Sequence, residues 1–414
     1  FNSSLLIGTV RYVSKTGTSQ PPYTNWLTAA DSIQKAVNIA DIGDTIYVAN
    51  GVYNESIYID KTINLIGSSM DSTVIDGRNT YSSINAIIYF FENNSFFKNF
   101  KVISPGYNRI GINTRNSKIH AENCWIDNVY LPLSFHGFLS SPNIEKFIIT
   151  NFGNSAIWSS CGYTPCQDIY RDNVIISTGS SETPISIEFG SPTFSNNIVI
   201  EEEYQTVGID VSASTIGHPI IIKNNLVSGY NWEGIKVTFQ QSVADTSYII
   251  NNNVTHNSVH QVFSQGAVYT NNGSKLQIKN NIITNSYRGI GAIGSNMVRG
   301  DYNSFWEVSN LTYGNSGIGD SNVIANPMFM KDTIPIANGN YDFHLQKYSP
   351  AIDKGDPSIL DIDGSRSDIG MFGGPFGQRY TYQDLAPKPP RNLTASMDSG
   401  LVHLKWNKNT EADL

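Results

Sequence analysis

Short runs of alternating apolar and polar residues fill most of this chain, and they predict β-strands. Each run covers about three to five residues and is bounded by Gly, Asn or Ser, which favour turns. Apolar spacing of three and four residues, which is typical of an amphipathic helix, is clear only in residues 28–40. There, a capping-box pattern from Thr28 to Asp31 precedes one apolar face made of Ile33, Ala36, Val37 and Ala40. The pattern predicts an all-β chain with one short helix.

An Asn that precedes a β-rich run recurs along the chain at a regular spacing. The recurring positions are Asn99, Asn123, Asn173, Asn197, Asn225, Asn253 and Asn281. They are 24, 50, 24, 28, 28 and 28 residues apart, and Lys146 divides the interval of 50 into 23 and 27. A repeat of this length predicts a solenoid with one coil per repeat. Three short strands per coil favour a parallel β-helix, whose coils stack about 4.8 Å apart.

The repeated Asn and the helix both have structural explanations in such a solenoid. Asn side chains of successive coils are expected to hydrogen-bond along the stack and to hold each turn residue in a left-handed conformation. The helix in residues 28–40 is expected to cap the N-terminal end, where an open coil would expose its apolar interior and unpaired strand edges.

Composition and charge exclude two classes of function. The 414 residues include 27 Lys and Arg against 35 Asp and Glu, a net charge of −8, so we expect no nucleic acid as a partner. Charged residues make up only 15% of the chain, yet no apolar segment of about 20 residues predicts a membrane span. A surface rich in Asn, Ser, Thr, Gly and Tyr indicates a secreted, extracellular protein whose signal peptide is already absent.

Six segments of the chain resemble parts of known proteins. They are residues 12–17, 41–55, 326–329, 342–345, 349–353 and 361–370. The first two are similar to the opening of right-handed parallel β-helix proteins of the pectate-lyase-like superfamily, and the others resemble the closing segment of secreted bacterial members. The resemblance implies a right-handed parallel β-helix over residues 1–375. It leaves the reaction open, because this superfamily includes lyases, hydrolases, esterases, epimerases and non-catalytic binders.

A second module is predicted after the β-helix. Residues 376–388 are rich in Pro and Gly, which indicates a linker. Residues 389–414 are similar to the first two strands of a fibronectin type III domain. Because such a sandwich needs about 100 residues, we expect a truncated fragment of that module here.

A column of outward-facing residues carries the candidate chemistry. In most coils one strand begins with a small and then an aliphatic residue, and the next residue should face solvent because strand side chains alternate. That position is occupied by Asn113, Trp158, Asp210, Lys236, Tyr269 and Gly291, with Ser134 or His136 and Ser186 or Glu188 from two irregular coils. The column spans about 29 Å, which is long enough for several sugar rings. Polysaccharide is therefore the expected partner.

Further substrate contacts are expected beside this column. Trp232 and Glu233 directly precede the strand of Lys236, and they are expected to form a wall of the groove. Arg288 flanks the next coil and is expected to bind an anionic group.

Two mechanisms fit Glu188, Asp210 and Lys236. In the leading hypothesis, Glu188 and Asp210 hold a Ca²⁺ that neutralises a uronate carboxylate, and Lys236 removes the C5 proton in a β-elimination. In the alternative, the carboxylates act as a proton donor and as a nucleophile or base in glycoside hydrolysis. A non-catalytic glycan-binding solenoid is a third hypothesis. The structural alternative is a ladder of surface ion pairs.

Three other features of the sequence allow more than one interpretation. Cys161 and Cys166 could close a small disulfide loop, whereas Cys124 stands alone. Residues 361–368 place carboxylates as a cation-binding loop does, although a structural turn is favoured. A flat β-helix face can also dimerise, so an oligomer is possible.

Overall fold

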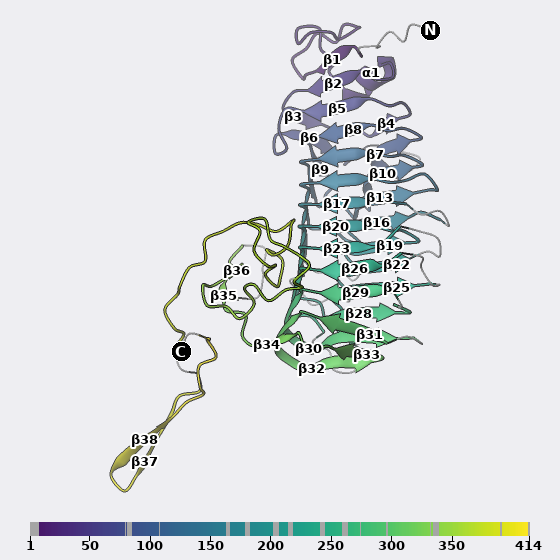
Figure 1. The fold of residues 1–414 in the computed structure, drawn as a ribbon. Coiled ribbons are helices and arrows are strands. Elements are labelled where there is room, and N and C mark those ends of the chain that lie inside the picture. Colours follow the sequence, from purple (N-terminus) through teal and green to yellow (C-terminus); the bar gives the residue numbers. More distant parts are fainter. Residues whose placement is uncertain are drawn as a thin grey trace.

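The chain forms a parallel β-solenoid, as its repeat predicts (Figure 1). The computed structural model describes residues 8–78, 80, 85–106, 108–162, 166–178, 183–201, 207–213, 218–240, 245–258, 264–273, 275–294, 297–331, 333, 339–389 and 391–412. Within these ranges there is a single helix, and none that is long and apolar enough to cross a membrane.

Sheet A runs the length of the solenoid, and the described residues contribute 13 strands to it. In spatial order they are β1 (Val10–Val13), β2 (Thr45–Val48), β5 (Asn64–Gly67), β8 (Phe96–Lys98), β11 (His120–Glu122), β14 (Asn143–Glu145), β17 (Ile169–Arg171), β20 (Thr193–Ser195), β23 (Ile221–Lys223), β26 (Ser247–Ile250), β29 (Leu276–Lys279), β31 (Val298–Asp301) and β33 (Ser316–Ile318).

Sheet B is a second face of the solenoid, and it carries the predicted column. Its strands are β4 (Ile57–Ile59), β7 (Ala86–Phe91), β10 (Ile110–Arg115), β13 (Leu131–His136), β16 (Ile157–Ser160), β19 (Ile185–Glu188), β22 (Ile209–Ala213), β25 (Ile235–Phe239) and β28 (Val268–Asn271).

Sheet C is the third face, and the long strands β30 and β32 continue from it into sheet B. Its strands are β3 (Gly51–Tyr53), β6 (Thr73–Asp76), β9 (Lys101–Ile103), β12 (Trp125–Asp127), β15 (Ile148–Thr150), β18 (Val174–Ser177), β21 (Ile198–Glu201), β24 (Leu226–Ser228), β27 (Asn253–Thr255), β30 (Ile282–Ile293), β32 (Ser304–Gly314) and β34 (Val323–Ile324).

The core is built from inward-facing aliphatic residues that stack from coil to coil. On sheet B one such stack is fully buried and consists of Ile112, Leu133, Ile157, Ile185, Ile209, Ile235, Val268 and Ile290. Burying each of these side chains contributes about 1.5–3 kcal/mol. Because side chains alternate along a strand, the residue after each member of the stack faces outward.

The repeated Asn residues fall into two adjacent columns, which corrects the single column predicted from the sequence. One column is a ladder in which each amide donates to the side-chain oxygen of the next coil, at 2.9 Å for the first five bonds. Its buried members are Asn173, Asn197, Asn225, Asn252, Asn281 and Asn303, and the half-buried Asn322 ends it. The position just before it has φ of 52° to 64° and includes Asn99, Asn123, Lys146, Asp172, Asn196, Asn224, Asn251, Asn280 and Tyr302. The ladder residue and the left-handed residue are therefore neighbours, and Asn253 belongs to neither column.

The helix α1 (Ile33–Ile39) covers the first coils, as predicted, but it is capped differently. The Thr28–Asp31 pattern does not cap it, because the helix begins at Ile33 and its N-cap Ser32 makes no side-chain cap. Instead the carboxylate of Glu55 accepts hydrogen bonds from the backbone N–H groups of Ile33 at 2.8 Å and Gln34 at 3.0 Å. Ile33, Ala36 and Val37 are buried.

The closing segment, residues 326–382, packs against one side of the solenoid (Figure 1). It contains the antiparallel pair β35 (Phe329–Lys331) and β36 (Asp342–Leu345). Left-handed Asn residues of the solenoid bind its backbone. Asn224 donates to the carbonyl groups of Met371 and Gly373, and Asn251 donates to those of Asp368 and Gly370.

The carboxylates of residues 361–368 are used in turns of this segment. Asp361 accepts the N–H of Asp368 at 3.0 Å, and Asp363 accepts the N–H of Ser365 at 3.0 Å. Asp368 accepts the Tyr382 hydroxyl at 2.7 Å. This arrangement agrees with the structural turn favoured by the sequence.

The last strands, β37 (Thr394–Asp398) and β38 (Leu401–Lys405), form an exposed antiparallel hairpin that projects away from the solenoid (Figure 1). The fibronectin type III module to which this hairpin was assigned stays a prediction.

Candidate functional site

The pairing of strands brings the predicted column into one line. Asn113, Ser134, Trp158, Ser186, Asp210, Lys236, Tyr269 and Gly291 are consecutive register partners. The two irregular coils therefore contribute Ser134 and Ser186. His136 and Glu188 lie two residues farther along their strands, in a parallel row that continues through Ser212 and Thr238.

An ion pair forms the centre of the column. Lys236 Nζ lies 2.7 Å from Asp210 Oδ2, and the two residues are partners on β25 and β22. Both side chains are partly exposed, at 31% for Lys236 and 25% for Asp210. A substrate on sheet B can therefore contact either group.

A shallow groove of about 450 Å³ surrounds this pair. The two rows supply its floor, and its lining consists of Ser186, Ile187, Glu188, Phe189, Asp210, Ser212, Lys236, Thr238 and Gln240. Hydroxyl and amide groups in such a groove can hydrogen-bond sugar hydroxyls. The sequence did not single out Ser212, Thr238 and Gln240, although each follows a column residue by two or four positions.

Glu188 and Asp210 do not fit the Ca²⁺ site predicted from the sequence. Glu188 is the register partner of Ser212, whereas Asp210 is the partner of Ser186, so the two acids are diagonal neighbours. Ca²⁺ requires about six to eight oxygen ligands, and one oxygen of Asp210 is already bound by the Lys236 ammonium. A cation between the two acids would lie close to that positive charge.

Glu233 is a buried carboxyl group beside the ion pair. It is 4% exposed, and its Oε1 accepts the backbone N–H of Gln265 at 2.9 Å. Burial raises the pKa of Glu233 to about 7, while the charges of Lys236 and Asp210 act on it in opposite directions. At neutral pH a large fraction of this carboxyl group is therefore protonated, which is the state a proton donor requires.

Three other predicted contacts lie around Glu233. Tyr269 is 3% exposed, and burial, followed by the charge of Glu233, raises its pKa to about 12. Arg288 donates to the carbonyl of Ser264 and stacks over the Tyr313 ring at 4.0 Å. Trp232 is exposed next to Glu233. Of the three, Trp232 offers the most surface to a ligand.

The other end of the column is aromatic. The rings of His136 and Trp158 are 4.6 Å apart, and His136 Nε2 lies 2.7 Å from the Ser134 hydroxyl. Burial, with a smaller contribution from Arg115, lowers the pKa of His136. Asn113 lies at the same end and is 6% exposed.

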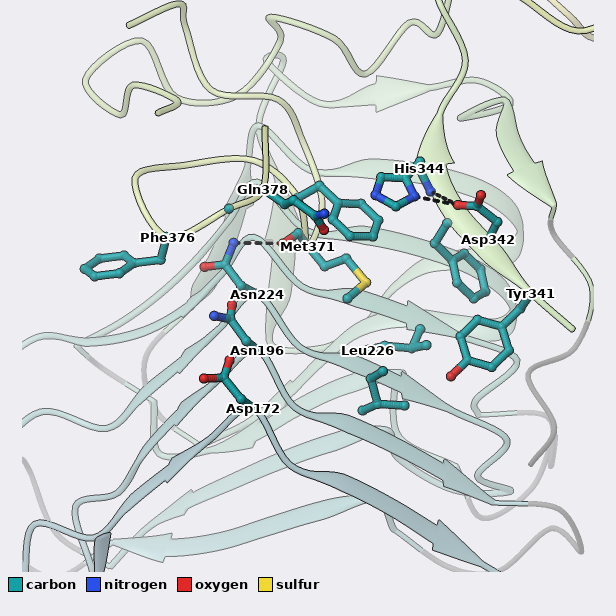
Figure 2. A pocket seen from close by; sticks show the side chains of 14 residues that line it. Asp172, Asn196, Asn224, Leu226, Tyr341, Asp342, His344, Met371, Phe376 and Gln378 are labelled. Atoms are coloured by element: carbon teal, nitrogen blue, oxygen red, sulfur yellow. Dashed lines mark hydrogen bonds and ion pairs between the residues drawn. The ribbon is translucent and has the colours of Figure 1, made fainter. Parts of the chain in front are cut away.

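A separate cleft of about 530 Å³ lies between the solenoid and the closing segment (Figure 2). Asp172, Asn196 and Asn224 form one wall, and Tyr341, Phe343, Phe372 and Phe376 contribute aromatic surface. His344 stacks on Phe372 at 3.9 Å, and its Nδ1 lies 2.6 Å from Asp342 Oδ1. The sequence did not reveal this cleft, because residues more than a hundred positions apart form it. We favour the groove on sheet B as the candidate active site, because it contains a partly exposed carboxylate, Asp210, paired with the amine of Lys236. The charges of both groups act on the buried acid Glu233, which lies outside the lining of the groove.

Comparisons with known proteins add likeness of fold only. No protein-family model and no curated protein sequence matches this chain. Among solved structures, an alginate lyase from Paenibacillus sp. str. FPU-7 has a TM-score of 0.42 at 14% identity, over 69% of this chain and 96% of that one. The pectate lyase Pel9A has a TM-score of 0.42 at 14% identity, over 88% and 96%. The catalytic unit of an α-1,3-glucanase from Streptomyces thermodiastaticus strain HF3-3 has a TM-score of 0.39 at 12% identity, over 70% and 64%.

Proposed function

We propose that this chain is a secreted polysaccharide-degrading enzyme whose reaction takes place in the groove of sheet B. One observation carries the proposal. The partly exposed carboxylate of Asp210 and the amine of Lys236 form an ion pair in this groove, and the charges of both act on the buried carboxyl group of Glu233. Cleavage of a glycosidic bond needs a proton donor and a second carboxylate or base, and these residues supply both.

Hydrolysis is the reaction that this arrangement supports best. Glu233, held partly protonated by burial, donates a proton to the leaving glycosidic oxygen. Asp210 then acts as the nucleophile at the anomeric carbon or as the base that activates a water molecule. Lys236 holds the Asp210 side chain in position through their 2.7 Å ion pair.

The substrate class follows from the lining of the groove. Trp158 is a register neighbour of Ser186, so its ring lies in line with the polar centre. Aromatic rings stack on the C–H faces of pyranoses, and the hydroxyl groups of Ser186, Ser212 and Thr238 suit sugar hydroxyls. With one amine and two acids at its centre, the groove favours a neutral or weakly acidic polysaccharide over a dense polyanion.

A panel of neutral and uronate-containing polysaccharides tests this proposal. Each reaction is followed in parallel for new reducing ends and for the ultraviolet absorbance of unsaturated uronates, with and without EDTA. We expect reducing ends without new absorbance, and no effect of EDTA. Binding to any of these polysaccharides without product would overturn the proposal in favour of a non-catalytic glycan-binding solenoid.

β-Elimination is the second candidate, and the position of Lys236 favours it. Its side chain is partly exposed to the groove, and once its ammonium group has lost a proton the free amine could remove a proton next to a uronate carboxylate. The same assay separates the two candidates, because elimination produces an unsaturated sugar and hydrolysis does not. New absorbance that accompanies the reducing ends would replace hydrolysis by elimination.

A further inference from the structure

Three buried side chains with metal-binding atoms meet between sheets B and A, one coil from the groove. Cys161 directly follows β16, whereas Asp168 directly precedes β17 and Cys166 lies two residues before Asp168. The two sulfur atoms and a carboxylate oxygen all lie within 4.8 Å of one another. None of the three residues is more than 1% exposed. No disulfide joins the cysteines, and the Cys161 thiol hydrogen-bonds to Cys166.

The carboxylate of Asp168 is only half satisfied by protein groups. Its Oδ2 accepts the hydroxyl groups of Ser159 at 2.7 Å and Tyr170 at 3.0 Å. Its Oδ1 is buried and has no hydrogen-bond partner among the described residues. A buried polar atom without a partner costs about 1–3 kcal/mol, and more when it is charged. A bound cation would remove that cost.

The surroundings of Asp168 differ from those of the other cluster of potential ligands, His120, Glu122 and Glu145. In that cluster, Lys98 pairs with Glu122 and Arg171 pairs with Glu145. Those acids are therefore neutralised by basic side chains. Across the described ranges, no Lys or Arg forms an ion pair with Asp168.

We propose that Cys161, Cys166 and Asp168 bind a thiophilic divalent cation, for which Zn²⁺ is the best match. Two sulfur ligands select Zn²⁺ over Ca²⁺ or Mg²⁺, which prefer oxygen alone. Zn²⁺ binds sulfur at about 2.3 Å and carboxylate oxygen at about 2.0–2.2 Å, so its tetrahedral ligand atoms lie about 3.6–3.8 Å apart. The present separations, which are all within 4.8 Å, require a contraction of at most about 1 Å. The Ser159 hydroxyl or a water molecule would complete the tetrahedron.

Binding involves no change of redox state. Both thiols lose their protons as they bind the cation, and Asp168 binds as a carboxylate. A Cys161–Cys166 disulfide is the competing arrangement, because it would use the same two sulfur atoms. That disulfide would leave Asp168 Oδ1 without a partner, whereas the metal site would not.

Titration of the full chain with Co²⁺ in the presence of a non-thiol reductant tests the proposal. We expect one Co²⁺ per chain, with thiolate-to-cobalt charge-transfer absorption that Zn²⁺ abolishes by displacement. Cys161→Ala and Cys166→Ala should lose that absorption. Asp168→Asn should weaken binding by about tenfold or more. Cys124→Ala is the matched control, because it removes a buried thiol elsewhere in the core.

Circular dichroism of each variant shows whether its solenoid remains folded. Thermal unfolding of the wild type with and without Zn²⁺ tests binding independently of the variants. Zn²⁺ should raise the Tm of the wild type and of Cys124→Ala. The site would be overturned if the reduced wild type failed to bind one equivalent of Co²⁺. It would also be overturned if protein from zinc-supplemented medium, isolated without reductant, contained a Cys161–Cys166 disulfide. Binding by Asp168→Asn as tight as that of the wild type would overturn the role of the carboxylate.

Discussion

Lys236 Nζ lies 2.7 Å from Asp210 Oδ2, across two neighbouring parallel strands of the solenoid. The pair is partly exposed, so its contribution to stability is small, about 0–1 kcal/mol. Its position next to the buried carboxyl group of Glu233 gives it another consequence. Glu233 is affected by a negative and a positive charge at once, and a change in either partner should alter its proton affinity.

Asp210→Asn is expected to lower kcat by about 10²–10⁴-fold on the polysaccharide that the enzyme cleaves. The amide keeps the shape of the side chain but can act neither as nucleophile nor as base. The measurement is the rate of reducing-end release, with unfolding in urea as the check on stability. Glu122→Gln is the matched control, because it breaks an ion pair with Lys98 on sheet A, away from the groove. Equal losses in both variants would contradict a catalytic role for Asp210.

Lys236→Met separates the two candidate reactions. In hydrolysis, Lys236 positions Asp210, so we expect a loss of about tenfold with reducing ends still formed. In elimination, Lys236 is the base, and its loss should remove activity by about 10²-fold or more. The products of the wild type and of the variant are compared by the same two assays.

Activity and stability should both depend on Glu233 near neutral pH. Because the protonated form donates the proton, kcat should fall as the pH rises through about 7, and Glu233→Gln should be inactive. The stability effect has the same direction. Burial raises the pKa of Glu233 from 4.5 to about 7, so the folded state binds the proton more tightly than the unfolded state. The contribution of protonated Glu233 to the stability of the folded state is complete below pH 4.5 and is lost as the pH rises toward 7.

Urea unfolding of the wild type and of Glu233→Gln at several pH values tests the predicted pH dependence of stability. The stability of the wild type relative to the variant should fall between about pH 4.5 and 7, by a few kcal/mol. The measured quantity is the difference in unfolding free energy between the two proteins. It isolates Glu233, because burial also raises the pKa values of Asp168 and Asp368 to about 6, and these groups titrate in both proteins. A pH-independent difference would show that Glu233 titrates normally.

The fold could be predicted from the sequence because it repeats. Each coil contributes the same column of inward aliphatic residues, so the register of Asp210 and Lys236 follows from Gly208 and Gly234, which occupy equivalent positions. The two Asn columns could not be separated, because Asn stands at both neighbouring positions of several coils. At Asn251 and Asn252, for example, only the backbone conformation tells which residue is left-handed.

The site was harder to predict than the fold, because its chemistry depends on burial in loops. Glu233 is recognisable in the sequence as a residue near Lys236, but its raised pKa results from burial, which only the folded chain shows. The backbone N–H of Gln265, from the next coil, donates to this carboxyl group and lowers the pKa. The cap of the helix is another long-range case. Glu55 lies more than 20 positions from the N–H groups that it binds, and no local pattern marks it.

The Asn ladder should account for a large part of the stability of the central coils. Asn225 is fully buried; its amide donates to Asn252, and its carbonyl oxygen accepts from the backbone and side chain of Asn197. Asn225→Leu would leave several of these groups without partners, so we expect a loss of about 3 kcal/mol or more. Urea unfolding measures it. Asn94→Ala, at an exposed position, should change stability by less than about 0.5 kcal/mol, and a similar loss in both variants would contradict the ladder.

The cap of α1 depends on Glu55 and should be sensitive to its charge. Its carboxylate binds the N–H groups of Ile33 and Gln34 and the hydroxyl of Ser32. Glu55→Ala removes all three bonds and a negative charge at the start of the helix, so we expect a loss of about 1–2 kcal/mol. Glu55→Gln keeps one acceptor oxygen and should lose less. Because the cap covers the first coils, hydrogen exchange in Glu55→Ala should accelerate at Ile46 and Val48 of β2 before it does in sheet B. Uniform acceleration along the solenoid would show that the cap does not protect the N-terminal end.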